Sequence, residues 1–306
     1  MESDLQSFFT FVIFVQIIIG NLSNEFILLI NLIDWFNRRK LSSVDQIITI
    51  LAVSRIGLIW GILVSWSQFI NSFPKLKQLI ITVYIWILSN HFSLWLATIL
   101  SIFYLLKIAR FSRPIFLYLK WRVKKVILTI LFGMLVFLFF NVMQINTHIK
   151  NWKHNHEKNT TWNFTVTDFV TLSRHIILSI TMFSLTPFIL ALISFLLLIV
   201  SLWKHLRKMQ LNCKGSRDPR TNDHINALKI MVSFLLLYTS YFLSRIVSWI
   251  SHIYQVKLVD LLSMAIGLFY PSTHSLVLIL GNSKLSKASF FVLRKLKCRI
   301  KNETTA

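Results

Sequence analysis

Seven long apolar runs constrain this chain more than any other feature of its sequence. A helix needs about 20 mostly apolar residues to cross the hydrocarbon core of a bilayer, and backbone groups inside lipid must bond within their own segment. The runs therefore predict an all-α membrane protein, a seven-transmembrane-helix bundle. The predicted spans are about 8–33, 44–66, 81–106, 126–146, 173–203, 230–250 and 259–281. They leave a short N-terminal segment at 1–7 and a basic tail at 282–306.

The composition agrees with a membrane protein. Hydrophobic residues make up 55% of the 306-residue chain, charged residues only 14%, and the mean hydropathy is +0.64. A soluble domain of this length carries nearly twice that charged fraction. The lipid bilayer is therefore a predicted partner of this chain.

The positive charge predicts the topology. The net charge is +22, and 24 of the 33 Lys and Arg lie in the tail and in the connections after the first, third and fifth spans. The other connections hold six. Because cationic segments stay in the cytosol, the N-terminus is predicted outside and the tail inside. The positive charge therefore indicates how the chain is oriented in the membrane. No nucleic acid partner is expected.

Glycosylation motifs and cysteines fit the same topology. Asn159 and Asn163 begin Asn-x-Ser/Thr motifs in the connection between the fourth and fifth spans, which is predicted external. Cys213 and Cys298 both fall on the predicted cytosolic side, so no disulfide is expected. The tail is interpreted either as an amphipathic helix on the membrane or as a solvated, frayed end.

An aromatic stripe on the sixth span carries a charge. Tyr238, Tyr241, Phe242 and Arg245 share one helical face at about 100° per residue. Such stripes are more often helix-packing surface than ligand site. Since a charge is costly against lipid, Arg245 favours a watered cavity at the external end of this face.

Other residues at similar depth favour a pocket in the external half. Trp86 and Asn90 lie at i and i+4 on the third span, Met264 and Leu268 share a face of the seventh, and Trp66 ends the second. Ordinary packing explains each of them singly. Together they predict a site with few polar anchors, which suits small, mostly apolar ligands.

Arg55 lies near the middle of the second span. We expect it to pair with Glu25, or to be solvated by Asn24 and by polar groups of the seventh span such as His274 and Ser275. A purely structural packing role is the alternative.

Motifs of catalytic or metal chemistry are missing from the sequence. It contains no P-loop, no G-x-S-x-G, no H-E-x-x-H and no cysteine-based zinc pattern. His148, His154 and His156 are interpreted as solvated loop histidines. We therefore expect no enzyme, no catalytic residue, no cofactor and no metal.

Several segments resemble the type 2 taste receptors, which are the bitter-taste G-protein-coupled receptors. The quoted segments are Asn24-Glu25-Phe26-Ile27, Leu51-Ala52-Val53-Ser54-Arg55, Phe103-Tyr104-Leu105-Leu106-Lys107, Ser201-Leu202-Trp203-Lys204-His205, Ser233-Phe234-Leu235-Leu236-Leu237-Tyr238 and Tyr270-Pro271-Ser272-Thr273-His274-Ser275. Each is weak alone, but their order and spacing together are specific, and they cover nearly the whole chain.

The resemblance implies a receptor for bitter small molecules. Such a receptor couples to a gustducin-like heterotrimeric G protein, and signals through phospholipase C and calcium at the plasma membrane. In similar receptors, the agonist pocket is lined or bordered by the positions of Trp66, Trp86, Asn90, Tyr241, Arg245 and Met264. Tyr238 joins Asn24, Arg55, His274 and Ser275 in the expected activation network, and a homo- or hetero-oligomer is left open.

A basic surface at the cytosolic ends of the spans is the expected G-protein face. Its residues are Tyr104, Lys107, His205, Lys208, His224 and Lys229. For most of these cations a purely topological role is the plainer interpretation. A seven-helix transporter or lipid-handling protein is the alternative function, although Glu25 is the only clear acid inside a span.

Overall fold

The computed structural model describes residues 2–37, 40–71, 76–109, 114–156, 166–212, 219–254 and 256–303. These residues form nine helices and no strand. The helices are α1 Glu2–Phe36, α2 Ser43–Asn71, α3 Leu76–Ile108, α4 Pro114–Trp121, α5 Val123–His156, α6 Val166–Asn212, α7 Pro219–Tyr254, α8 Lys257–Gly281 and α9 Ser283–Glu303. Seven of them, all but α4 and α9, are long and apolar enough to cross a membrane. The predicted seven-helix bundle is confirmed.

The helices extend beyond the predicted spans. Most plainly, α1 begins at Glu2, and α6 runs from Val166 to Asn212 around an internal Pro187. Apolar content marks the part of a helix that sits in lipid, whereas the hydrogen-bonded backbone continues into polar sequence. His148, His154 and His156 were predicted in a loop for this reason, and all three lie in α5 instead.

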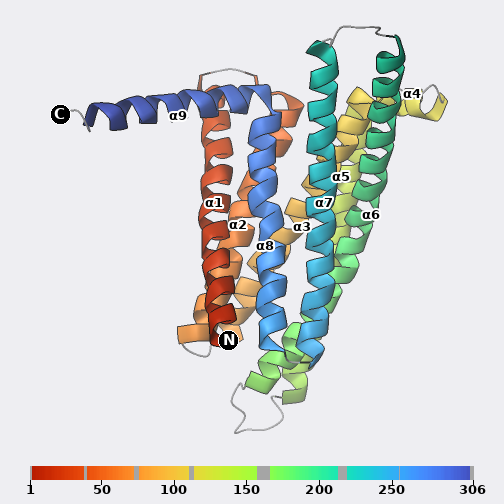
Figure 1. Cartoon of the computed structure of the whole chain (residues 1–306). Coiled ribbons are helices and arrows are strands. Elements are labelled where there is room, and N and C mark those ends of the chain that lie inside the picture. The colour runs from red at the N-terminus through yellow and green to blue at the C-terminus, as the bar shows by residue number, and fades with distance from the viewer. Residues whose placement is uncertain are drawn as a thin grey trace.

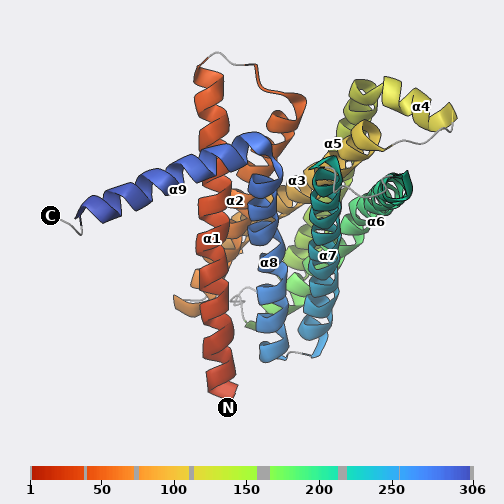
Figure 2. The same ribbon diagram turned by 45° about the horizontal axis from the view of Figure 1, so that its top comes forward.

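The spanning helices run alternately up and down (Figure 1). The chain starts at one end of the bundle, here named the N-terminal end, and α9 leaves at the other, here named the α9 end. Figure 2 shows α9 directed away from the bundle and across its axis. α3 is the central helix: 67% of its most apolar stretch is buried, against 11% for α5. The outward residues of α5, such as Phe132 and Phe139, are therefore lipid-facing.

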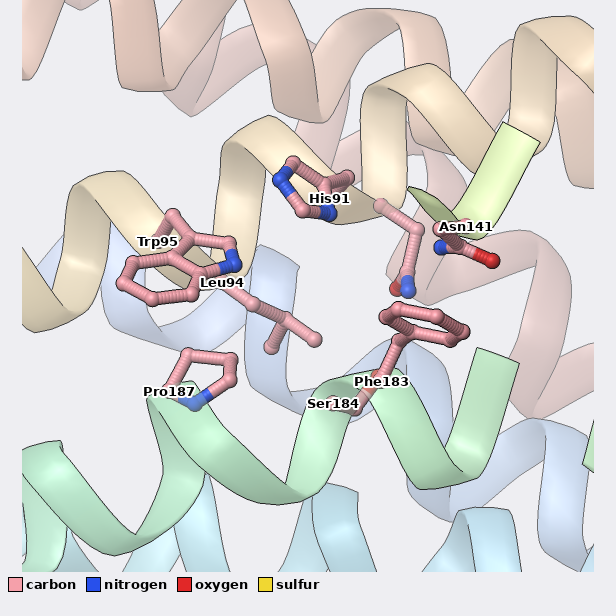
Figure 3. A pocket seen from close by; sticks show the side chains of 8 residues that line it. His91, Leu94, Trp95, Asn141, Phe183, Ser184 and Pro187 are labelled. Carbon is pink, nitrogen blue, oxygen red and sulfur yellow. The ribbon is translucent and has the colours of Figure 1, made fainter. Parts of the chain in front are cut away.

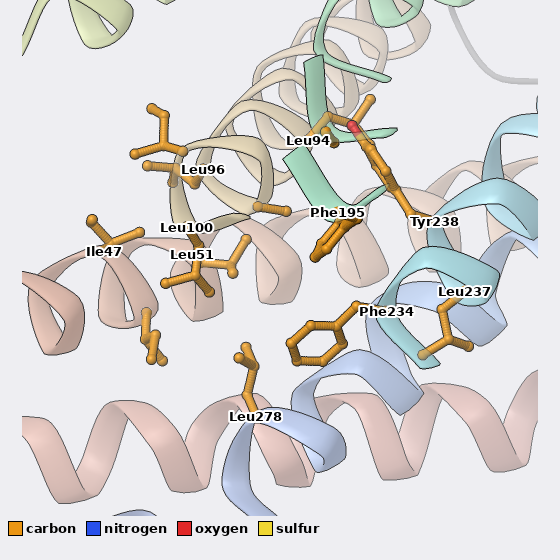
Figure 4. Packing of buried hydrophobic residues seen from close by; sticks show 14 of the residues in the cluster. Ile47, Leu51, Leu94, Leu96, Leu100, Phe195, Phe234, Leu237, Tyr238 and Leu278 are labelled. Atoms are coloured by element: carbon orange, nitrogen blue, oxygen red, sulfur yellow. The ribbon is translucent and has the colours of Figure 1, made fainter. Parts of the chain in front are cut away.

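The main core lies between α2, α3, α6, α7 and α8. Ile47, Leu51, Leu100, Phe195 and Phe234 belong to it, and Figure 4 shows these side chains of α2, α3, α6 and α7 close together. Burial of this apolar surface fixes the rotation of each helix about its axis. That rotation decides which polar side chains face one another inside the bundle.

Small residues bring α1 close to α8. A Cβ at Gly20 would lie 2.6 Å from Oγ of Ser272 and 2.7 Å from Cδ1 of Ile59. The Ser272 hydroxyl donates to the carbonyl oxygen of Gln16 at 2.8 Å. Only a residue without a side chain fits at position 20 without displacing these neighbours.

The tail contains a helix, as the first of the two interpretations expected. The side chain of Asn282 accepts from the backbone N–H of Lys284 at 3.0 Å and so caps α9. Nζ of Lys284 lies 2.8 Å from a carboxylate oxygen of Asp34 and 2.7 Å from the side-chain oxygen of Asn31, both on α1. These contacts anchor the start of α9 to the bundle. Further along, Phe290 and Cys298 are exposed.

Candidate functional site

Two contacts join α3 to α7 in the half of the bundle nearer the N-terminal end. The hydroxyl of Tyr241 donates to the side-chain oxygen of Asn90, and both residues are buried. About one helical turn away, the guanidinium of Arg245 lies 4.8 Å from the ring centroid of Trp86, a cation–π arrangement. Four of the predicted pocket residues therefore lie together.

Arg245 retains unused hydrogen-bonding capacity. Within the described part of the chain, its Nε and Nη2 are buried and have no hydrogen-bond acceptor. A guanidinium offers five N–H donors, and leaving buried donors unpaired costs free energy. A hydrogen-bond acceptor placed beside these nitrogens would remove that cost.

A chain of aromatic rings leads away from this site. Tyr270 on α8 lies with its ring centroid 5.3 Å from those of Tyr238, Tyr241 and His274. The ring of Phe234 lies 4.2 Å from that of His274. These rings therefore form a direct contact between α7 and α8 next to the Asn90–Tyr241 bond.

Arg55 is fully buried between α1, α2 and α8. Its Nη1 donates to Oγ of Ser275 at 2.9 Å, and its Nη2 donates to the hydroxyl of Tyr270 at 3.4 Å. The Ser275 hydroxyl in turn donates to the side-chain oxygen of Asn24 at 2.7 Å. One arginine thus links three helices through hydroxyl groups.

The expected pair between Arg55 and Glu25 does not form. Glu25 is exposed on the outer face of α1, whereas Asn24 points inward. Adjacent residues on a helix differ by about 100° in direction, so only one of the two can face α2. The other predicted partners, Asn24 and Ser275, are the ones in place.

A small polar cavity lies beside Asn90 between α3, α5 and α6 (Figure 3). It measures about 10 Å³ for the centre of a water molecule, so it has room for about one water. Its lining residues are Asn90, His91, Leu94, Trp95, Asn141, Phe183, Ser184 and Pro187. Side chains must therefore move before a larger molecule fits here.

The structure does not bring all predicted pocket residues together. Leu268 and Met264 pack with Ile13 and Ile59 in a separate apolar cluster against α1 and α2. Phe242 stacks on Phe188 of α6, with centroids 4.2 Å apart. The side chain of Trp66 lies outside the described residues.

Sequence reasoning missed two residues of this region. Tyr270 contacts both Arg55 and the tyrosine rings of α7. The sequence feature that could have pointed to it is a tyrosine hydroxyl inside an apolar span. Thr98 on α3 lies 3.0 Å from the carbonyl oxygen of Pro187 on α6 and 3.5 Å from the Tyr238 hydroxyl. Its neighbours on other helices cannot be read from sequence spacing.

The predicted G-protein face is partly described. Lys107 and Lys229 are exposed near the α9 end, and Nζ of Lys107 lies 5.5 Å from the ring centroid of Phe103. Tyr104 and His205 are half-buried. The side chains of Lys208 and His224 lie outside the described residues, and so do Asn159 and Asn163.

Within the described ranges, no group of three or more His, Cys, Asp or Glu is placed to hold a metal ion.

Comparison with known proteins identifies the family. The model of the family Taste receptor protein (TAS2R) matches residues 1–297. This chain belongs to the type 2 taste receptor family. The receptor is 62% identical over 298 residues to taste receptor type 2 member 13 of Pongo pygmaeus, covering 96% of this chain and 98% of the relative. It is 61% identical over the same length to the Homo sapiens protein of that name, with the same coverage. It is 52% identical over 301 residues to the Mus musculus one, covering 97% and 99% of the two chains.

The family places the receptor in a functional class. It is a multi-pass membrane protein and a bitter-taste receptor, as the sequence segments predicted. A receptor of this class responds to a ligand and couples to a G protein. The match disfavours the alternative of a seven-helix transporter or lipid-handling protein.

Proposed function

We propose that this receptor binds small, mostly apolar bitter compounds between α3, α7 and α8 and activates a gustducin-like heterotrimeric G protein. Signalling then runs through phospholipase C and calcium, and the receptor works in the plasma membrane as a non-enzymatic transducer. In this proposal the N-terminal end faces outward and the α9 end faces the cytosol.

One observation carries the ligand site: the buried contacts Trp86–Arg245 and Asn90–Tyr241 lie about a turn apart on the same two helices. They combine the aromatic rings of Trp86 and Tyr241, the amide of Asn90 and a guanidinium with two nitrogens that are unpaired among the described residues. An apolar compound with one acceptor group gains burial against the rings and a bond to Arg245. Met264, Leu268 and Phe242 pack against other helices and are left out of the site in this proposal, and Trp66 stays a predicted member.

Activation follows from the contact of Tyr241 with Tyr270. Tyr241 bonds to the ligand-site residue Asn90 on one side and packs on Tyr270 on the other. Tyr270 accepts a hydrogen bond from Arg55. An agonist that binds better when α7 is displaced shifts the receptor towards that state, and only this difference in affinity drives the change. Asn24, Arg55, Tyr238, His274 and Ser275 form the network that responds.

The displaced state opens the α9 end to the G protein. We assign the docking surface to Tyr104, Lys107, His205, Lys208, His224 and Lys229. The exposed cations Lys107 and Lys229 lie on two different helices, α3 and α7. A change in the separation of these helices therefore changes the spacing of the positive charges that a partner meets.

Calcium imaging in cells that express the receptor with a matched G protein tests the ligand site. Trp86→Ala and Asn90→Ala are expected to weaken agonist potency at least tenfold with unchanged surface level. Trp60→Ala is the matched control, because Trp60 is exposed on the outside of α2. Unchanged potency of every agonist in both variants removes these residues from the site.

Glycosylation mapping tests the orientation. Asn159 and Asn163 are proposed to carry sugar, whereas Asn302 in the tail is not. Peptide mapping of the purified receptor after enzymatic deglycosylation distinguishes the sites. Sugar on Asn302 reverses the orientation and removes the G-protein face from the cytosol.

A further inference from the structure

Two histidines from different helices lie face to face near the N-terminal end. His148 on α5 and His175 on α6 have nearly parallel rings, with an interplanar angle of 10° and centroids 5.6 Å apart. His148 is half-buried and His175 is exposed. The proposed ligand site does not include this pair.

Buried apolar neighbours fix the backbone on both sides of the pair. Ile145 and Ile149 flank His148 on α5, and Ile176 follows His175 on α6. All three belong to one buried cluster that packs α3, α5 and α6 together. The two Cα atoms are therefore held in place, and the side chain of His175 is exposed to solvent.

The pair lies where the apolar parts of both helices give way to polar sequence. From Gln144 to His156, the end of α5 is rich in Asn, Lys and His, and the start of α6 before Ile176 contains Asp168 and Arg174. His148 lies two residues beyond the predicted span 126–146, and His175 is the third residue of the predicted span 173–203, so the pair lies at the edge of the hydrocarbon core. The imidazoles are therefore reachable by an ion from water.

The separation of the rings fits two ligands of one metal ion. Zinc binds a histidine nitrogen at about 2.0–2.1 Å in tetrahedral geometry, which sets the two ring centroids roughly 5 Å apart. The observed 5.6 Å is close to that separation. Parallel rings do not direct their nitrogens to one point, so binding requires one ring to turn. The exposed His175 has the room to do so.

We propose that His148 and His175 form a site for a transition-metal ion of the zinc and copper(II) class. Imidazole nitrogen suits both ions. The two histidines supply two ligands, and water completes the coordination. Nearby cations, Lys150 and Arg174, oppose the charge of the ion, so the site binds exchangeably. A bound ion ties α5 to α6 at their ends.

Binding measurements on the purified full-length receptor, free of any histidine tag, test the site without agonist or G protein. Zn²⁺ affinity is measured by titration calorimetry in lipid nanodiscs. His148→Ala and His175→Ala are each expected to weaken Zn²⁺ binding at least fivefold, and the double variant is expected to bind more weakly than either single one because it keeps neither imidazole. His154→Ala is the control, because His154 is exposed on the same helix and is expected to bind as the parent does.

A second measurement keeps the test independent of folding. Electron paramagnetic resonance of Cu²⁺ bound to the parent is expected to show two imidazole nitrogens, and one nitrogen in each single variant. Loss of less than fivefold in either variant overturns the proposal, as does an equal loss in His154→Ala. Equal thermal unfolding temperatures without metal show that the variants are folded, and His175→Asn replaces His175→Ala if they differ.

Discussion

Arg55 and Arg245 both lie inside membrane spans, yet the bundle holds them differently. Arg55 is fully buried and donates to two hydroxyl groups on α8. Arg245 is half-buried and rests on the ring of Trp86, with its buried Nε and Nη2 unpaired within the described part of the chain. Arg55 also rests on a ring, that of Tyr270, and leaves one buried donor, Nε, unpaired in the same sense. The difference is that Arg55 uses both terminal nitrogens for bonds to α8, whereas Arg245 leaves two nitrogens unpaired among the described residues. In our proposal Arg55 holds the bundle together and Arg245 meets the ligand.

Arg55→Ala is expected to have the largest effect on stability. It opens a cavity between three helices and leaves the Tyr270 hydroxyl without its donor, which together cost roughly 2–4 kcal/mol. Thermal unfolding of the detergent-purified receptor measures the loss. Arg55→Met keeps most of the volume and removes a desolvated charge, so its loss of stability is smaller. An unfolding temperature of Arg55→Ala equal to that of the parent contradicts the structural role.

Gly20→Val is expected to rank second, because it forces α1 away from Ser272 and Ile59. Overpacking of this kind costs about 1–3 kcal/mol. The movement of α1 also displaces Asn24, which lies one turn further along the helix and accepts a hydrogen bond from Ser275, a partner of Arg55. Arg55 itself is unchanged. Gly133→Val on α5 is the control, because a Cβ there meets nothing within 4 Å. Equal unfolding temperatures for both variants exclude close packing at Gly20.

Arg245→Ala is expected to change ligand response rather than stability. Potency for agonists that bear an acceptor group falls about tenfold, equivalent to about 1.4 kcal/mol. Calcium dose–response curves at matched surface levels give the shift. Leu243→Ala, at an exposed position of the same helix, serves as the control and retains full potency. The comparison between the two arginines fails if Arg245→Ala unfolds the receptor as Arg55→Ala does.

Lys284→Ala is expected to have the smallest effect. Lys284 has carboxylate partners, Asp34 at 2.8 Å and Asp45 at 3.6 Å, but its side chain is 32% exposed. Ion pairs at such exposure contribute about 0.5–1 kcal/mol. The unfolding temperature is therefore expected to fall slightly, and less so at high salt. Lys287→Ala, at an exposed position of α9, is the comparison, and a larger loss for that variant rules out the anchoring role.

The sequence predicted the fold well, because lipid imposes a simple rule on it. A run of apolar residues long enough to cross the bilayer must be a helix, so seven runs gave seven helices. The helix ends were less predictable, since hydrogen bonding continues into polar sequence, as at His148. The sequence left two interpretations of the tail open. It could not decide for the helix α9, because the contact between Lys284 and Asp34 that anchors this helix joins residues far apart in the chain.

The sequence predicted which site residues share a face of one helix. It predicted less well which residues of other helices they contact. Helical spacing correctly grouped Trp86 with Asn90 and Tyr241 with Arg245. It did not show that Met264 and Leu268 turn towards α1 and α2, because spacing along one helix does not fix its rotation against the others. The same limit left Arg55 with two sets of partners, and neither set included Tyr270.

Pro271 on α8 has a mechanical consequence for the network around Arg55. Its ring lacks an N–H, so the carbonyl oxygen of Gly267 loses its usual rung in the helical ladder. Helices bend most readily at such gaps. Tyr270 lies at this gap and Ser275 about one turn beyond it. A bend of α8 at Pro271 therefore changes the distance between the two hydroxyl groups that accept hydrogen bonds from Arg55. The guanidinium bridges the position at which α8 bends most readily.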